Sequence, residues 1–165
     1  MTEFQWRTFG GNEWNNPPAP YVEIEFVGPN GAITIPGMFD TGADSTELPT
    51  MYRLQLDIGL DHCAPMKAHG GWRPMTVVEA RLDGNAFDMP VTFVDQYLPD
   101  GQPIVLFGRA GIQDHYRVEL APPLTTFTWI EGSHSPLVAA YDNWLVEWIH
   151  VHGGGIVDGV NYDHP

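Results

Sequence analysis

Three consecutive residues, Asp40, Thr41 and Gly42, combine a carboxylate, a small hydroxyl group and a flexible backbone unit. They follow an apolar run that ends in Met38 and Phe39. A carboxylate at a tight turn after a buried strand can accept hydrogen bonds from nearby backbone N–H groups. Because a carboxyl group held in this way can act as a general acid or base, Asp40 is the candidate catalytic residue.

The overall charge of the chain is strongly negative. Seven Lys and Arg residues stand against 21 Asp and Glu residues, which gives a formal net charge of −14 over 165 residues. This balance excludes a typical nucleic-acid surface and disfavours an anionic membrane as a partner. No apolar run approaches the ~20 residues needed to span a bilayer, and no signal peptide is recognisable at the start, so we expect a cytoplasmic protein.

Frequent Gly and Pro residues separate short segments rich in Val, Ile, Thr and Phe, which indicates an all-β fold. We expect a short helix over 112–115, and the segment 48–60 is ambiguous between a strand with a loop and a helical turn. In the tail, apolar residues recur at three- and four-residue steps and predict an amphipathic helix of about 14 residues. Strands are expected over 21–27, 32–39, 65–68, 74–82, 86–94, 103–107, 116–120 and 125–130.

These elements divide the chain into three parts. Residues 1–20 form an extended N-terminal lead-in, residues 21–130 form the main domain, and residues 131–165 form a helical extension with a loose tail. Ser135-Pro136 would start the tail helix and Gly153 would follow its end. Cys63 is the single cysteine, so an intrachain disulfide is excluded, and a partly buried structural thiol fits better than a nucleophile.

The histidines of the tail raise the possibility of a metal site. His150 and His152 together with His134 or His164 are of the type that binds zinc. The predicted helix ends between them, however, and no cysteine or acidic residue stands at a fixed spacing. We therefore expect no metal and no cofactor.

Two later segments accompany the Asp-Thr-Gly triplet: His-Gly-Gly-Trp at 69–72 within a predicted hairpin, and Phe-Gly-Arg at 107–109 after an apolar strand. Together with Asp-Thr-Gly-Ala-Asp at 40–44, they resemble the retropepsin-like, or retroviral-type, aspartic proteases. The resemblance covers about residues 21–130. The N-terminal lead-in and the helical tail lie outside the minimal retroviral unit. The basic residue of that family's N-terminal arm has no firm match, Arg7 being a candidate.

The resemblance implies an acid-protease fold with one lobe per chain, closed by dimerisation. Aspartic proteolysis uses two carboxylates about 3 Å apart that share one proton, since two like charges so close cannot both ionise. The chain carries one Asp-Thr-Gly triplet and no Asp-Ser-Gly. The resemblance therefore implies a symmetric homodimer in which Asp40 faces Asp40 of the partner subunit. Such a dyad activates a water molecule and requires no metal or cofactor.

The residues after Asp40 receive roles from the same resemblance. Thr41 would hydrogen-bond to the backbone of the partner subunit, and Gly42 would let the backbone approach substrate closely. Ala43 stands where two-lobed relatives often place Ser, which donates to the catalytic carboxylate. Without that donor, we expect activity to extend closer to neutral pH.

Asp44, Gly108 and Arg109 would brace the active-site loop, with an ion pair between Asp44 and Arg109. The alternative for Asp44 is an ordinary surface charge. Ile104 and Leu106 are candidates for side-chain pockets or for core packing.

The segment 69–72 corresponds to the family's flap tip. Gly70 and Gly71 would let the flap open and close over substrate, with His69 and Trp72 bordering the cleft. A solvated loop histidine is the alternative for His69.

The function favoured by the sequence is thus an aspartic endopeptidase that cleaves extended peptides. Its partners would be a second copy of the chain and a peptide or protein substrate. A catalytically silent dimeric module that binds peptides is the main alternative, and a self-processing fragment of a larger polyprotein is another.

Overall fold

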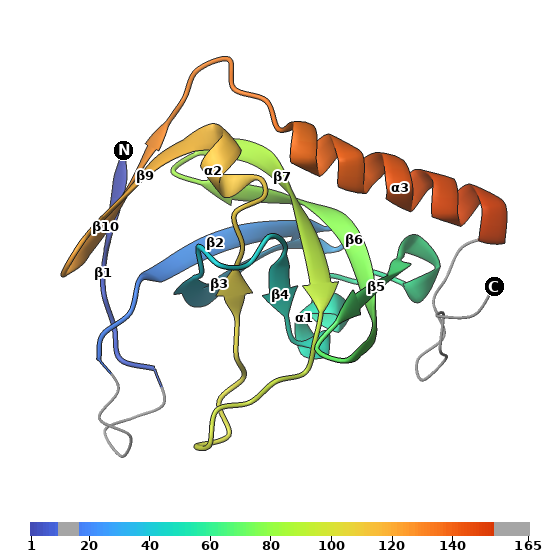
Figure 1. The fold of residues 1–165 in the computed structure, drawn as a ribbon, viewed down its shortest axis with the longest axis horizontal. Coiled ribbons are helices and arrows are strands. Elements are labelled where there is room, and N and C mark those ends of the chain that lie inside the picture. The colour runs from blue at the N-terminus through green and yellow to red at the C-terminus, as the bar shows by residue number, and fades with distance from the viewer. Residues whose placement is uncertain (10–16, 154–165) are drawn as a thin grey trace.

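The computed structural model describes residues 1–9 and 17–153. Its strands pair mainly through hairpins, and they form one large and one small sheet (Figure 1). The large sheet has the order β2-β3-β8-β4-β7-β6-β5, and a further pairing of β2 with β6 closes it on itself. Its strands are β2 (Tyr21–Gly28), β3 (Gly31–Phe39), β4 (Thr46–Leu48), β5 (Ala64–Ala68), β6 (Gly71–Leu82), β7 (Asn85–Phe93) and β8 (Leu106–Phe107).

The small sheet joins the N-terminal segment to a C-terminal hairpin. It has the order β1-β10-β9, with β1 (Thr2–Gln5), β9 (Tyr116–Ala121) and β10 (Leu124–Trp129) all antiparallel. The expected lead-in therefore contains a strand, which pairs with β10. Its Phe4 packs edge-on against Phe127, with ring centroids 6.0 Å apart. Arg7 lies 4.0 Å above the ring of Tyr21 in the same chain. Residues 10–16 and the expected loose tail, 156–165, lie outside the described residues.

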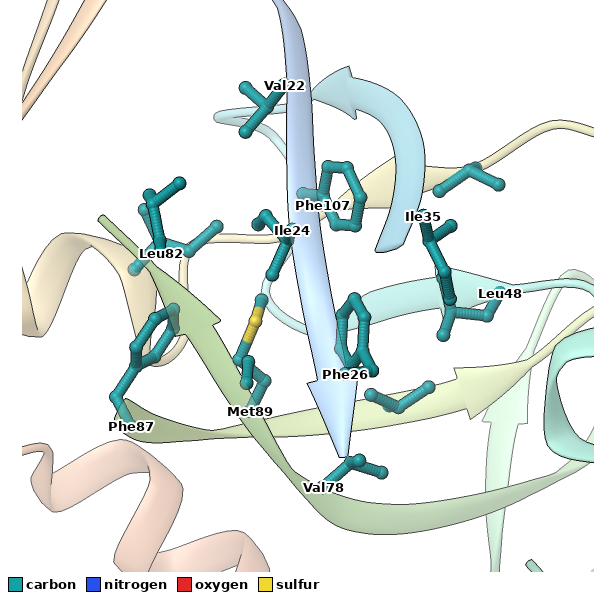
Figure 2. Packing of buried hydrophobic residues seen from close by; sticks show 14 of the residues in the cluster. Val22, Ile24, Phe26, Ile35, Leu48, Val78, Leu82, Phe87, Met89 and Phe107 are labelled. Atoms are coloured by element: carbon teal, nitrogen blue, oxygen red, sulfur yellow. The ribbon is translucent and has the colours of Figure 1, made fainter. Parts of the chain in front are cut away.

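Side chains from six strands of the large sheet meet in one core. Phe26 from β2 and Phe107 from β8 are fully buried and stack with ring centroids 6.1 Å apart. Burial of one such side chain stabilises a fold by roughly 1.5–3 kcal/mol. Figure 2 shows these rings among Val22, Ile24, Ile35, Leu48, Val78, Leu82, Phe87 and Met89.

The boundaries of several elements differ from those expected. Because Ala68 pairs with Gly71, the β5–β6 hairpin turns at His69 and Gly70 alone, and Gly71 and Trp72 belong to β6. Both turn residues have positive φ angles, 49° and 73°, as a type I′ turn requires. β8 is shorter than the expected 103–107, because the chain before it pairs with residues 96–98 instead.

The ambiguous segment 48–60 contains the end of β4 and one short helix, and a 3₁₀ helix begins at its last residue. These are α1 (Thr50–Gln55) and the 3₁₀ helix η2 (Leu60–His62). Asp95 starts α1 by accepting hydrogen bonds from the backbone N–H and the hydroxyl group of Thr50, both at 2.8 Å. The short helix expected at 112–115 is α2 (Ile112–His115).

The predicted tail helix is α3 (Pro136–His152), and it packs against β5, β6 and β7 (Figure 1). The hydroxyl oxygen of Ser135 caps its start by accepting from the N–H of Val138 at 3.1 Å, and Gly153 ends it with a φ of 71°. Leu145 on its buried face packs with Ala64, Met75 and the partly buried tryptophans Trp144 and Trp148. No helix in the described part of the chain is long and apolar enough to cross a membrane.

This packing predicts a difference between two neighbouring positions of α3. Leu145 is 6% exposed, so Leu145→Ala should lower the free energy of unfolding by about 2–4 kcal/mol through lost burial and a residual cavity. Val146 is 60% exposed, so Val146→Ala should change it by less than about 0.5 kcal/mol. Urea denaturation of both variants measures the difference, and equal losses would contradict the packing of α3 on the β5–β6 hairpin.

Candidate active site

The position of Asp40 is determined by the parallel pairing of β3 and β8. Met38 lies opposite Leu106, and Phe39 opposite Phe107. The pairing continues one step further, since the N–H of Asp40 donates to the carbonyl oxygen of Phe107 at 2.9 Å. Phe39 and Phe107 are both buried. The two strands therefore end together at the core boundary, and Asp40 begins the loop there.

The loop folds back on the Asp40 carboxylate. The N–H of Gly42 donates to Oδ1 of Asp40 at 2.8 Å, and the N–H of Ala43 donates to its carbonyl oxygen at 3.2 Å. A Cβ atom at Gly42 would lie 3.2 Å from the same Oδ1, which is tighter than an ordinary contact. Thr41 and Gly42 are exposed. The loop thus holds a partly exposed carboxylate in a defined orientation.

A second loop, after β8, supports the first through its backbone. The N–H of Arg109 donates to the carbonyl oxygen of Ala43 at 2.8 Å, and the N–H of Gly108 donates to the buried hydroxyl of Thr46 at 3.1 Å. Gly108 must lack a side chain, because a Cβ atom there would lie 2.4 Å from the carbonyl oxygen of Ser45. The Gly-Arg segment predicted to brace the active-site loop is therefore in direct contact with it.

Asp44 and Arg109 form the expected ion pair, between Oδ1 and Nη2. The pKa of Arg109 is raised, mainly by its hydrogen bond to Asp44 and to a smaller extent by the opposite charge of that carboxylate. The two side chains are 56% and 46% exposed, and ion pairs so open to water contribute little to stability. The backbone hydrogen bonds and the Thr46–Gly108 contact therefore hold the loop more firmly than the ion pair does.

The β5–β6 hairpin, which carries the segment predicted to be a flap, bends toward the strand that follows the loop. Nε2 of His69 at its tip lies 2.7 Å from Oε1 of Glu47 on β4. A Cβ atom at Gly70 would meet no atom of the described residues within 4 Å, so these residues leave the tip open on that side. Trp72 lines a groove of about 450 Å³ between this hairpin and α3, together with Met66 and Tyr141. Glu47 was not among the residues predicted from the sequence, because no strand was expected at 46–48 and nothing local connects it with His69.

The remaining candidates do not add to this site. Cys63 is fully buried, and burial raises the pKa of its thiol to about 12, which fits a structural residue. His152 stacks on Trp148 with ring centroids 3.7 Å apart. Within residues 1–9 and 17–153, no three His, Cys, Asp or Glu side chains gather as metal ligands, and His164 lies outside this range.

Comparison with known proteins supports the fold. Neither a protein-family model nor a curated protein sequence matches the chain. The structure is similar to the crystal structure of a retropepsin-like aspartic protease from Rickettsia conorii, with a TM-score of 0.53. The match covers 76% of this chain and 90% of that one at 16% sequence identity. The protein thus has an all-β, retropepsin-like fold with an added C-terminal helix.

The contact between Thr46 and Gly108 predicts the cost of removing one hydroxyl group. Thr46→Val leaves the buried N–H of Gly108 without its acceptor and should lower the free energy of unfolding by about 1–3 kcal/mol. Thr128→Val makes the same chemical change at an exposed position of β10 and should alter it by less than about 0.5 kcal/mol. Chemical denaturation compares the two, and an unchanged stability for Thr46→Val would contradict the bracing role.

Proposed function

We propose that the protein is an aspartic endopeptidase that acts as a homodimer, with Asp40 of each subunit forming the catalytic dyad. The observation that carries this proposal is the position of Asp40, at the joint end of β3 and β8 and held by Gly42 and Phe107. The retropepsin-like fold agrees with it. The single Asp-Thr-Gly triplet of the chain supplies half of a dyad, so a second copy must supply the other half.

The proposed reaction follows from two carboxyl groups that share one proton. The ionised member accepts a proton from a water molecule as the water attacks the scissile carbonyl carbon, and the protonated member donates to the carbonyl oxygen. The tetrahedral intermediate then collapses, and a proton passes to the leaving amine. No covalent bond to the protein forms in this scheme.

The neighbours of Asp40 would position the dyad and the substrate. Thr41, which is exposed, would hydrogen-bond to the backbone of the partner subunit, and Gly42 would leave room for the substrate. Ala43 has no side-chain donor for the catalytic carboxylate, so activity nearer neutral pH remains our prediction. Asp44, beside Arg109, would accept hydrogen bonds from substrate N–H groups.

The substrate would bind as an extended strand between the active-site loops and the β5–β6 hairpins of the two subunits. Backbone hydrogen bonds would supply affinity, and pockets on alternating sides would read side chains. The type I′ turn at His69 and Gly70 forms the tip of the hairpin that would close over the peptide.

The direct test replaces the carboxylate while keeping its shape. Asp40→Asn should lower kcat for cleavage of a mixed peptide library by at least about 10²–10⁴-fold, because the amide cannot exchange the proton. A pepstatin-type inhibitor should block the wild-type cleavage. The matched control is Asp61→Asn, since the Asp61 side chain is 73% exposed and is not among the proposed active-site residues.

Cleavage that persists in Asp40→Asn would overturn the catalytic assignment. Wild-type protein that cleaves no peptide between about pH 3 and pH 8, yet binds peptides, would instead identify the silent binding module.

A further inference from the structure

Glu47 is a charged residue on the face of β4 that points away from the core. Its neighbours Thr46 and Leu48 are fully buried, so alternation along the strand turns the Glu47 side chain toward the opposite face. Across the antiparallel β4–β8 pairing, Glu47 lies opposite Leu106. Leu106 in turn precedes Phe107, whose carbonyl oxygen holds the N–H of Asp40. The Glu47 carboxylate is therefore two strands away from the start of the Asp40 loop.

The β5–β6 hairpin covers this carboxylate. Oε1 of Glu47 has His69 as a partner at 2.7 Å, and the Glu47 side chain is only 16% exposed. Oε2 is buried and has no hydrogen-bond partner among the residues that the structure describes. A buried acceptor without a partner destabilises the folded state, and more strongly when it carries charge. With the β5–β6 hairpin in this position, one carboxylate oxygen of Glu47 thus has no donor among the described residues at the proposed peptide-binding cleft.

We propose that Glu47 determines substrate specificity by binding an arginine or lysine side chain of the peptide, within about three residues of the scissile bond. This inference rests on the proposed function. A guanidinium group can donate to both carboxylate oxygens at once, and an ammonium group can donate to one of them. The substrate cation would therefore give Oε2 a hydrogen-bond donor, which none of the described residues supplies.

The position on the strand explains why the preference concerns residues close to the cut. Adjacent strands lie about 4.8 Å apart, so β4 is about 10 Å from β3, where Asp40 begins its loop. One residue of an extended peptide spans about 3.3 Å, so this distance corresponds to a few residues at most. The substrate side chain that reaches Glu47 thus belongs to a residue close to the scissile bond.

His69 would serve as a substitute partner while the site is empty. Its side chain is 43% exposed and stands at the hairpin tip, so it can leave Glu47 when the hairpin lifts to admit a peptide. The formal net charge of −14 favours the approach of a basic peptide as well. That general attraction acts on any cation, whereas the Glu47 carboxylate acts at one position.

The test uses peptides that differ at one residue near the cut, which is Arg, Lys, citrulline, Leu or Glu in turn. Wild-type protein should cleave the Arg and Lys peptides with a kcat/KM about 10–100-fold above that of the citrulline peptide, because citrulline keeps the shape and loses the charge. Glu47→Gln should reduce this ratio to within about threefold, while the retained amide oxygen still accepts from His69. Glu119→Gln removes the same charge at an exposed position of β9 and should leave the ratio unchanged.

Two outcomes overturn the inference and leave the proposed function intact. One is wild-type cleavage without a basic preference near the cut, and the other is a preference that survives in Glu47→Gln. If the wild type cleaves nothing, the proposed function fails by itself. Fluorescence anisotropy then measures binding of the same labelled peptides to wild type and Glu47→Gln, and equal affinities for the Arg and citrulline peptides would overturn the inference.

Discussion

The whole site depends on the parallel pairing of β3 with β8. These two strands come from distant parts of the chain, and their buried phenylalanines, Phe39 and Phe107, anchor them side by side in the core. The carbonyl oxygen of Phe107 then fixes the N–H of Asp40 at 2.9 Å. Because packing of this kind tolerates little displacement, the same contacts that stabilise the fold also set the position of one carboxylate.

The other parts of the site follow from that pairing. Once β8 is in place, Gly108 can approach Ser45 closely and donate to Thr46, so the two loops become one unit. β4 then continues from this unit and carries Glu47 to the tip of the β5–β6 hairpin. The C-terminal helix α3 packs against the β5–β6 hairpin and against β7, and so supports the hairpin from outside residues 21–130. Core, loop, hairpin and tail helix therefore depend on one another.

Sequence reasoning succeeded where the signal is local. The apolar run before Asp40, the break between the expected strands 74–82 and 86–94 and the Ser-Pro start of the tail helix each act within a few residues, and the corresponding elements appear in the structure. Contacts between distant segments carried no such signal. The strand β1 was missed because it depends on β10 for its partner, and the pairing of Glu47 with His69 was missed because 22 residues separate them. The sequence also indicated that the Asp40 loop and the Gly-Arg segment lie together, whereas the relative strength of the interactions between them required the distances and burial.

A dyad that combines Asp40 from two subunits makes cleavage depend on both carboxylates of a dimer, which a subunit-mixing experiment measures. Wild-type protein is mixed with increasing amounts of Asp40→Asn at constant total concentration, left to exchange subunits, and assayed for peptide cleavage. If a functional dyad needs two intact carboxylates, activity falls as the square of the wild-type fraction. Activity that falls in simple proportion to the wild-type fraction would show that each subunit works alone, and would contradict the shared dyad.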